Sequence, residues 1–192
     1  MKILLTLFVL LFSSSVVAED ISDFQIEGMS IGDSLLDYFS EDEIKENIRK
    51  NAYRYKTDKK FTSLEFSGSF FEVYEDVQIS YKTSDKNFKI YYLAGLLFFD
   101  NMKNCYKQKN EIVDDLSQLL LNASKIDKGT IKHPSDDSGK STVNKVVFYF
   151  KSLDIIAVKC TDWSDAMYSK YSWVDNLRVV LKTKEFDDWI TR

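Results

Sequence analysis

Residues 143–161, VNKVVFYFKSLDIIAVKCT, are the stretch around which the rest of the fold can be predicted. Two runs rich in β-branched and aromatic residues, 143–151 and 155–161, are separated by a short polar turn, a pattern typical of an antiparallel β-hairpin. Side chains alternate between the two faces of a strand. One apolar face of the second strand is therefore formed by Ile156, Val158 and Cys160.

A long amphipathic helix is predicted over residues 103–124. Its apolar residues recur every three or four positions and form one stripe, made by Cys105, Ile112, Leu116, Leu119, Leu120 and Ala123. Cys105 thus lies on the face that we expect to pack against the hairpin, where Cys160 points. These are the two cysteines of the chain, so we predict a Cys105–Cys160 disulfide. It would close a loop of about 55 residues and stabilise the fold by about 4 kcal/mol on the chain-entropy model.

Shorter elements precede the long helix. Ser40-Glu41-Asp42-Glu43 matches a capping box, in which the Ser40 and Glu43 side chains satisfy reciprocal backbone donors. A helix should run from there to about Lys50, after a shorter one over residues 34–39. Period-two alternation of apolar residues then predicts three strands, over residues 61–67, 71–81 and 88–99.

The elements on either side of the hairpin are less regular. Residues 124–141 contain Gly129, Pro134 and Gly139 and are predicted to form an exposed loop. A last strand is expected over residues 174–182, followed by a short C-terminal helix over residues 185–190.

Together these elements predict an α+β fold, with about six strands in a mainly antiparallel sheet and helices on one side. The chain order is a helical segment, three strands, the long helix, two strands, a further strand and a final helix. The two halves share an order of elements, so one sheet or two small helix-plus-sheet units side by side would both satisfy the pattern.

The first 18 residues have the form of a cleavable signal peptide. Lys2 precedes the apolar run 3–12, and Val16-Val17-Ala18 places small residues at a cleavage site. The run is about half the length that a membrane span needs, no later segment is longer, and no cysteine follows it to anchor a lipoprotein. We expect cleavage after Ala18, a single domain over residues 19–192, and a periplasmic or secreted location, where paired cysteines form disulfides.

The charge of the chain argues against two classes of partner. The sequence has 26 basic and 30 acidic residues and a formal net charge of −4. Nucleic-acid binding needs a concentrated basic face, and a membrane-surface module needs a polybasic cluster. The dispersed lysines of this sequence predict neither.

Motifs for catalysis are also missing from the sequence. His133 is the only histidine; it precedes Pro134 in the predicted loop, so we expect a solvated side chain rather than a catalytic triad member. Residues 139–142 (GKST) resemble the end of a phosphate-binding loop, but the position for its first glycine is Pro134. The acidic pairs 136–137 and 187–188 lack calcium-loop spacing. We predict no metal site, no cofactor and no recognisable enzyme class.

Residues 28–36 (GMSIGDSLL) resemble the start of small exported bacterial domains, in which a G-[ST]-x-G-x-[ST] turn leads into two short helices. Outer-membrane assembly lipoproteins of the SmpA/OmlA type and β-lactamase-inhibitor-protein-like domains show this turn. With its lysine-rich composition and cysteine pair, the whole chain resembles secreted proteins of AT-rich marine alphaproteobacteria such as Pelagibacter. That resemblance implies export but no particular activity.

Aromatic residues gather in residues 162–173 (DWSDAMYSKYSW), and the candidate binding residues are Trp163, Tyr168, Tyr171 and Trp173. Exposed aromatic side chains bury a large area at low entropy cost and are enriched at recognition surfaces. Alternatively, these four residues cover one end of the sheet as a lid to the core.

The sequence therefore favours a non-catalytic exported module that binds a protein or an envelope component. The alternative is a periplasmic hydrolase or small-ligand carrier with a site built from acids and aromatics. A pair of carboxylates facing an apolar pocket would favour this alternative.

Overall fold

The computed structural model describes residues 20–52, 58–68 and 71–192, so the predicted signal peptide lies outside the described residues. The strands are β1 Phe61–Ser67, β2 Asp76–Lys82, β3 Ile90–Phe98, β4 Ser124–Lys132, β5 Thr142–Tyr149, β6 Ile155–Asp162 and β7 Asn176–Lys182. The described helices are α1 Glu41–Asn51, α2 Met102–Leu119, α3 Asp165–Tyr171 and α4 Lys184–Ile190, with 3-10 turns at Ile21–Asp23 and Leu35–Asp37.

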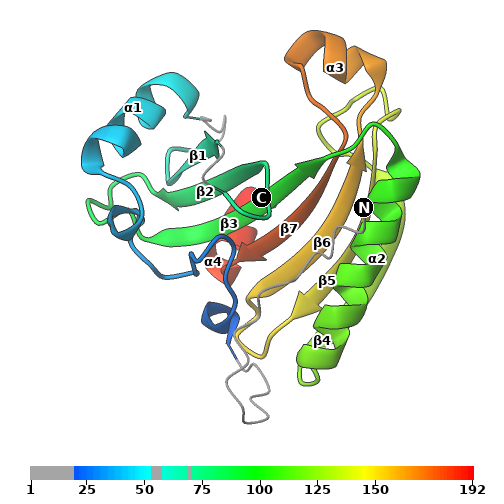
Figure 1. Cartoon of the computed structure of the whole chain (residues 1–192), viewed down its shortest axis with the longest axis horizontal. Coiled ribbons are helices and arrows are strands. Elements are labelled where there is room, and N and C mark those ends of the chain that lie inside the picture. Colours follow the sequence, from blue (N-terminus) through cyan, green and yellow to red (C-terminus); the bar gives the residue numbers. More distant parts are fainter. Residues whose placement is uncertain (1–19, 53–57, 69–70) are drawn as a thin grey trace.

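All seven strands belong to one antiparallel sheet with the spatial order β1-β2-β3-β7-β6-β5-β4. The last strand makes this sheet continuous, because β7 pairs with β3 on one side and with β6 on the other. Figure 1 shows β7 lying between these two strands. The α+β class and the antiparallel sheet are confirmed, and the pairing of β7 decides in favour of one sheet over two separate units.

The first face of the sheet, which we call the helical face, carries the main hydrophobic core. Residues 32–39 and helix α1 cover its β1–β3 half, and α2 lies along β6 and β7 (Figure 1). The Ser40 capping box that begins α1 is present as predicted. Residues buried on this face include Leu64, Ile79, Leu93, Ile156, Val158 and Leu177.

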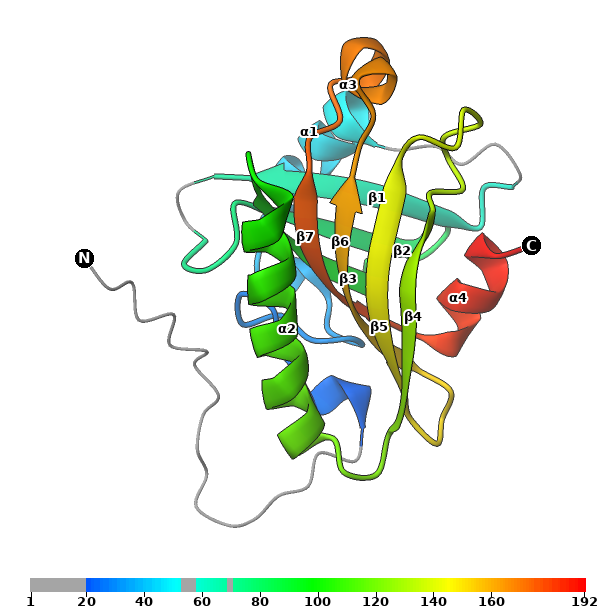
Figure 2. The same ribbon diagram turned by 90° about the vertical axis from the view of Figure 1, so that its right-hand side faces the viewer.

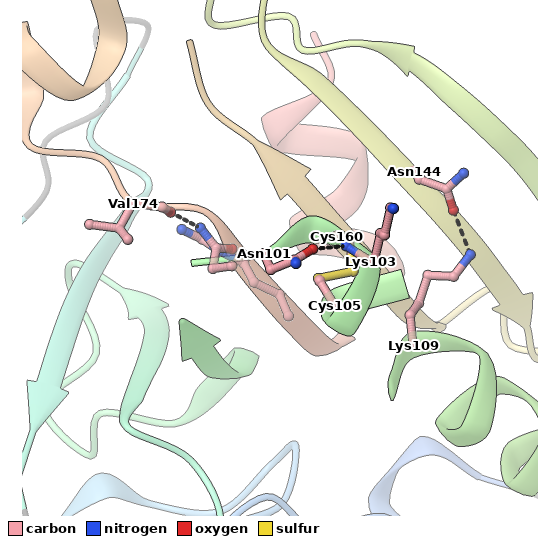
Figure 3. Close-up of a disulfide and its surroundings, with 9 residues drawn as sticks. Asn101, Lys103, Cys105, Lys109, Asn144, Cys160 and Val174 are labelled. Atoms are coloured by element: carbon pink, nitrogen blue, oxygen red, sulfur yellow. Dashed lines mark hydrogen bonds between the residues drawn. A yellow bond between two sulfur atoms is a disulfide. The ribbon is translucent and has the colours of Figure 1, made fainter. Parts of the chain in front are cut away.

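The predicted disulfide is confirmed on the helical face. Cys105 on α2 and Cys160 on β6 are joined, with 6.1 Å between their Cα atoms, and both are fully buried. One turn further along α2, buried Lys109 donates a hydrogen bond to the Asn144 side chain on β5 (Figure 3). The covalent bond and this polar contact fix α2 against β5 and β6.

The opposite face, which we call the second face, is covered at one end by α4. Phe186 of α4 contacts Phe61 on β1 and Tyr92 on β3, whose side chains lie on the face opposite Cys160. Figure 2 shows α2 and α4 on opposite sides of strands β4–β7. The expectation that the helices share one side was wrong for α4, because the aromatic residues of β1 and β3 on the second face need their own cover.

Two boundaries differ from the sequence prediction. Residues 124–141 are not a loop throughout. Residues 124–132 form β4, a strand in addition to the six that the sequence predicted. A register shift between Asp127 and Gly129 interrupts its period-two alternation, which hid the strand, and its side chains are mostly exposed.

The strand predicted from residue 71 begins only at Asp76. The backbone N–H groups of residues 72–74 instead donate to the Glu27 carboxylate, so a side chain replaces a partner strand there.

Candidate functional site

The four aromatic residues predicted for binding lie at the end of the sheet where β6 leaves and β7 returns. Trp163 follows β6, Tyr168 and Tyr171 belong to α3, and Trp173 precedes β7. The predicted connection 162–173 therefore contains a helix, which projects beyond the strands in Figure 1.

Four rings at this end are in successive contact, two pairs tilted and one pair stacked, and we call them the aromatic ladder: His133, Trp163, Trp173 and Tyr171. Their successive ring centroids are 4.2, 4.5 and 4.8 Å apart. Tyr171 is 47% exposed, whereas Trp163 and Trp173 are partly buried. Tyr168 is 59% exposed and lies outside the ladder. None of the ladder residues packs against the hydrophobic core clusters of the described chain, which disfavours a role as a lid to the core.

The expectation that His133 is solvated was wrong. It is partly buried against Trp163, and its Nδ1 atom accepts a hydrogen bond from the Ser135 backbone N–H. Burial, together with the positive charges of Lys159 and Arg178, lowers the pKa of His133 to about 4. The imidazole is thus neutral at physiological pH.

The Asp136 carboxylate holds the ladder's two chain segments together. One of its oxygens accepts hydrogen bonds from the Ser138 backbone and hydroxyl, and the other from those of Ser141 and from the Ser164 hydroxyl. The Ser141 carbonyl in turn accepts from the His133 backbone N–H. These serine hydrogen bonds hold the pKa of Asp136 well below its usual range. The carboxylate is therefore a structural link between residues 133–141 and the start of α3.

Next to the ladder, three cations stand in one row across the second face. Lys145 on β5 pairs directly with Lys159 on β6, which pairs directly with Arg178 on β7. We call these three residues the cation row. Directly paired residues of antiparallel strands point to the same face and have Cβ atoms about 5 Å apart, so the three positive side chains share one small area.

The two lysines of the row have no direct bonding partner in the described chain, although the Asp187 charge partly favours the charged form of Lys145. Within residues 20–52, 58–68 and 71–192, neither Lys145 nor Lys159 has an ion pair or a hydrogen bond from its side chain. Burial first, and then the charges of Arg178, Lys182 and Lys145, lower the pKa of Lys159 to about 7. Burial also lowers the pKa of Lys145.

Arg178 is held in place by neutral groups. Its Nε donates to the Asn176 side-chain oxygen at 3.0 Å, and its Nη1 donates to the Gln78 side-chain oxygen at 3.2 Å. Gln78 in turn donates to the Glu65 carboxylate on β1. Burial and the nearby Asp76 raise the pKa of Glu65, whereas the charge of Arg178 opposes this rise. The guanidinium is therefore fixed in position, and the Gln78 amide lies between it and the Glu65 carboxylate.

Neither of two surface hollows in the described chain is lined by the pair of carboxylates that a hydrolase of this kind would need. One, about 400 Å³, is lined by Lys59, Lys60, Lys82, Thr83 and Ser84, with no carboxylate in its lining. Another, about 170 Å³, has Glu27 in its lining, and that carboxylate already accepts three backbone hydrogen bonds. In the described part of the chain, no three His, Cys, Asp or Glu side chains are grouped as a metal site.

No family model, curated protein or solved structure matches this chain. The resemblance at residues 28–36 to exported bacterial domains stays a prediction. The described helices include none that is long and apolar enough to cross a membrane.

Sequence reasoning missed His133, Lys145, Lys159 and Arg178 as possible site residues. A signal for two of them was present, because Lys159 and Arg178 each stand between apolar neighbours in a predicted strand. The alignment of the three cations depends on the pairing register of β5, β6 and β7, which the alternation of residues within one strand does not specify.

Proposed function

We propose that this protein is an exported, non-catalytic module that binds a protein or an envelope component through the aromatic ladder. The observation that carries the proposal is the position of the ladder: its rings are in continuous contact, yet outside the core clusters. Rings fixed at a surface can bury area against a partner at little entropic cost.

Two further observations support this function. The Cys105–Cys160 disulfide is consistent with an oxidising compartment outside the cytoplasm. The Asp136 hydrogen bonds hold the ladder before any partner arrives, and preorganisation of this kind favours binding.

Of the alternative functions, the small-ligand carrier is favoured by a specific observation. The cation row presents positive charge, and among the described residues its two lysines have no ion-pair or hydrogen-bond partner. A carrier would bind an anion there, and its site would consist of cations and aromatics in place of acids and aromatics.

The ladder can be tested by affinity capture from the native envelope. We would compare the wild-type protein with a Tyr171→Ser/Trp173→Ser variant and with Leu121→Ser as the matched control. Leu121 is 71% exposed in the turn between α2 and β4, at the opposite end of the molecule from α3 (Figure 2).

We expect one envelope component to be enriched by the wild type and the control, and to be depleted about tenfold or more with the ladder variant. Circular dichroism would establish that all three proteins are folded. Equal enrichment by all three proteins would refute binding through the ladder.

A further inference from the structure

We propose that the cation row, Lys145, Lys159 and Arg178, is a binding site for a small soluble oxyanion of the phosphate or sulfate type. This inference goes beyond the proposed binding function, because it assigns a second site with a small ligand of its own. The site lies on the second face, beside the aromatic ladder.

The register of the sheet places the three cations side by side on the second face. Adjacent strands lie about 4.8 Å apart, and the three residues occupy directly paired positions on three consecutive strands. The two lysine side chains are long enough to converge from such positions on a single group, and Arg178, whose guanidinium is held toward β2 by Gln78, adds positive charge at the edge of the row. Phosphate and sulfate offer three or more acceptor oxygens, which suits donors that arrive from separate strands.

The surrounding carboxylates do not neutralise the row. Asp187 on α4 is bound to Lys182. Glu65 on β1 is bound by Gln78, and Asp76 on β2 is separated from Arg178 by Leu96 in the strand register. The acids thus lie at the flanks, and the centre of the row keeps an excess of positive charge that a dianion would compensate.

Apolar residues next to the row strengthen this attraction. The neighbouring positions on the same strands are Val147, Ala157 and Val180, all buried in an apolar cluster of the second face. Charges interact more strongly beside such an apolar cluster than in water, because the local dielectric constant is lower. The row is itself partly buried, which favours a small anion over a flat membrane surface.

Arg178 adds a fixed positive charge beside the two lysines. Its hydrogen bonds to Asn176 and Gln78 hold the guanidinium toward β2 without neutralising it. His133 and Trp163 lie beside the row, since Lys159 and Arg178 influence the pKa of His133. A ligand that carries its oxyanion next to a ring could therefore contact both the cation row and the ladder.

The experiment is a titration of the isotope-labelled, disulfide-bonded protein with inorganic sulfate, followed by amide NMR shifts against a chloride titration of equal ionic strength. Sulfate keeps its charge across the neutral pH range, so its own titration does not interfere. Lys145→Met and Lys159→Met test the row, and Lys86→Met is the matched control, because Lys86 is exposed in the turn between β2 and β3.

We expect saturable shifts in β5, β6 and β7 for the wild type and for Lys86→Met. Each row variant should bind sulfate about tenfold or more weakly. Both row variants should stay folded, because each replaces an uncompensated charge by an apolar side chain of similar length.

Shifts that grow linearly without saturation, or equal sulfate affinity in all four proteins, would overturn the proposal. Vesicles of phosphatidylglycerol provide the second arm: row-dependent binding to vesicles without sulfate binding in solution would overturn it in favour of a membrane surface. A failure of sulfate binding is distinguishable from a failure of the proposed function. Capture of an envelope component through the ladder is measured with a variant that leaves the cation row intact.

Discussion

Lys159 on β6 lies directly opposite Arg178 on β7, and the other neighbour of Lys159 in the same row is Lys145 on β5. Like charges in directly opposed positions of antiparallel strands destabilise the sheet. The cost is larger where the groups are partly buried, because removal from water also disfavours the charged form. The fold therefore tolerates a local conflict on the second face, as is common where a protein binds a ligand.

Replacing Lys159 by methionine should make the protein more stable. The change removes two like-charge contacts and the burial of an amine, and keeps an unbranched apolar chain over Ala157 and Val180. We expect a gain of about 1 kcal/mol in the free energy of unfolding, measured by chemical denaturation at pH 6.5. Lys86→Met should leave it nearly unchanged. A loss of stability in Lys159→Met would indicate that its ammonium makes a favourable contact within the fold.

The stability gain of Lys159→Met should also depend on pH. The pKa of Lys159 is about 7 in the folded protein, against 10.5 as its ordinary value. Above pH 7 the unfolded chain therefore binds more protons than the folded one, so wild-type stability rises with pH and the penalty from this lysine fades. Unfolding free energies at pH 6.5 and pH 8.5 should show a smaller difference between variant and wild type at the higher pH.

The pH dependence between 6.5 and 8.5 can be assigned to Lys159, because few of its neighbours titrate in this range. His133, with a pKa of about 4, stays neutral, and any contribution from Lys145 is shared by both proteins. The charged groups that face Lys159 or the row are Arg178, Lys182, Lys145 and Lys128, with Asp187, Glu65 and Asp76 at the flanks. A pH-independent difference would contradict a lowered pKa for Lys159.

The sequence predicted the parts of this molecule that depend on local pattern. Ser40 begins α1, the hairpin 143–161 forms, and period arguments at Cys105 and Cys160 correctly identified the disulfide. The prediction failed at β4, where the shift beside Gly129 conceals the alternation. It also failed for α4, because nothing in residues 184–190 specifies which face of the sheet they cover.

The candidate site could be predicted only in part. The aromatic content of residues 162–173 was visible, but the partner ring of Trp163 comes from His133, which precedes β5 in the chain. The cation row likewise depends on the register of three strands. Long-range pairing of this kind is decided by the whole sheet, and the sequence of one strand does not contain it.

Replacing His133 by phenylalanine should reduce the acid sensitivity of the protein. The pKa of His133 is lowered from 6.5 to about 4, so between these values the unfolded chain binds a proton that the folded protein does not. Wild-type stability is therefore lost as the pH falls through this window, by about 1 kcal/mol from this group once solvent screening of the partly exposed ring is included. The phenylalanine side chain would keep a ring against Trp163 but could not titrate.

The measurement for His133→Phe is the free energy of unfolding at pH 6.5 and at pH 4.5 in both proteins. We expect the wild type to lose more stability than the variant over this interval. A constant offset, such as that from the lost Ser135 hydrogen bond, would not change the difference in slope. Parallel pH profiles would show that the histidine is protonated with its ordinary pKa.

Removal of the disulfide should destabilise the protein without rearranging the sheet. Cys105 and Cys160 close a loop with a sequence separation of 55, so a Cys105→Ala/Cys160→Ala variant should lose about 4 kcal/mol on the chain-entropy model. Thermal and denaturant unfolding would measure the loss. Alkylation of the unfolded, unreduced wild type should label neither cysteine, and labelling of both would contradict the bond.

Replacing Asp136 by asparagine should release the aromatic ladder from the sheet end. The carboxylate accepts hydrogen bonds from Ser138, Ser141 and Ser164, and an amide nitrogen in place of one oxygen cannot accept them. Leaving such buried donors unsatisfied costs about 1–3 kcal/mol. The neighbouring residue supplies the control, because Asp137 is exposed and Asp137→Asn removes the same charge.

Two readouts separate a local effect of Asp136→Asn from general unfolding. The contact between Trp163 and Trp173, whose ring centroids lie 4.5 Å apart, should give a coupled indole signal in circular dichroism, and we expect it to weaken in Asp136→Asn alone. The far-ultraviolet circular dichroism of the sheet and helices should stay unchanged, because the Asp136 hydrogen bonds lie at the end of the sheet. If the indole signal and the capture of an envelope component both stay unchanged while stability falls, the carboxylate supports the fold but does not position the ladder.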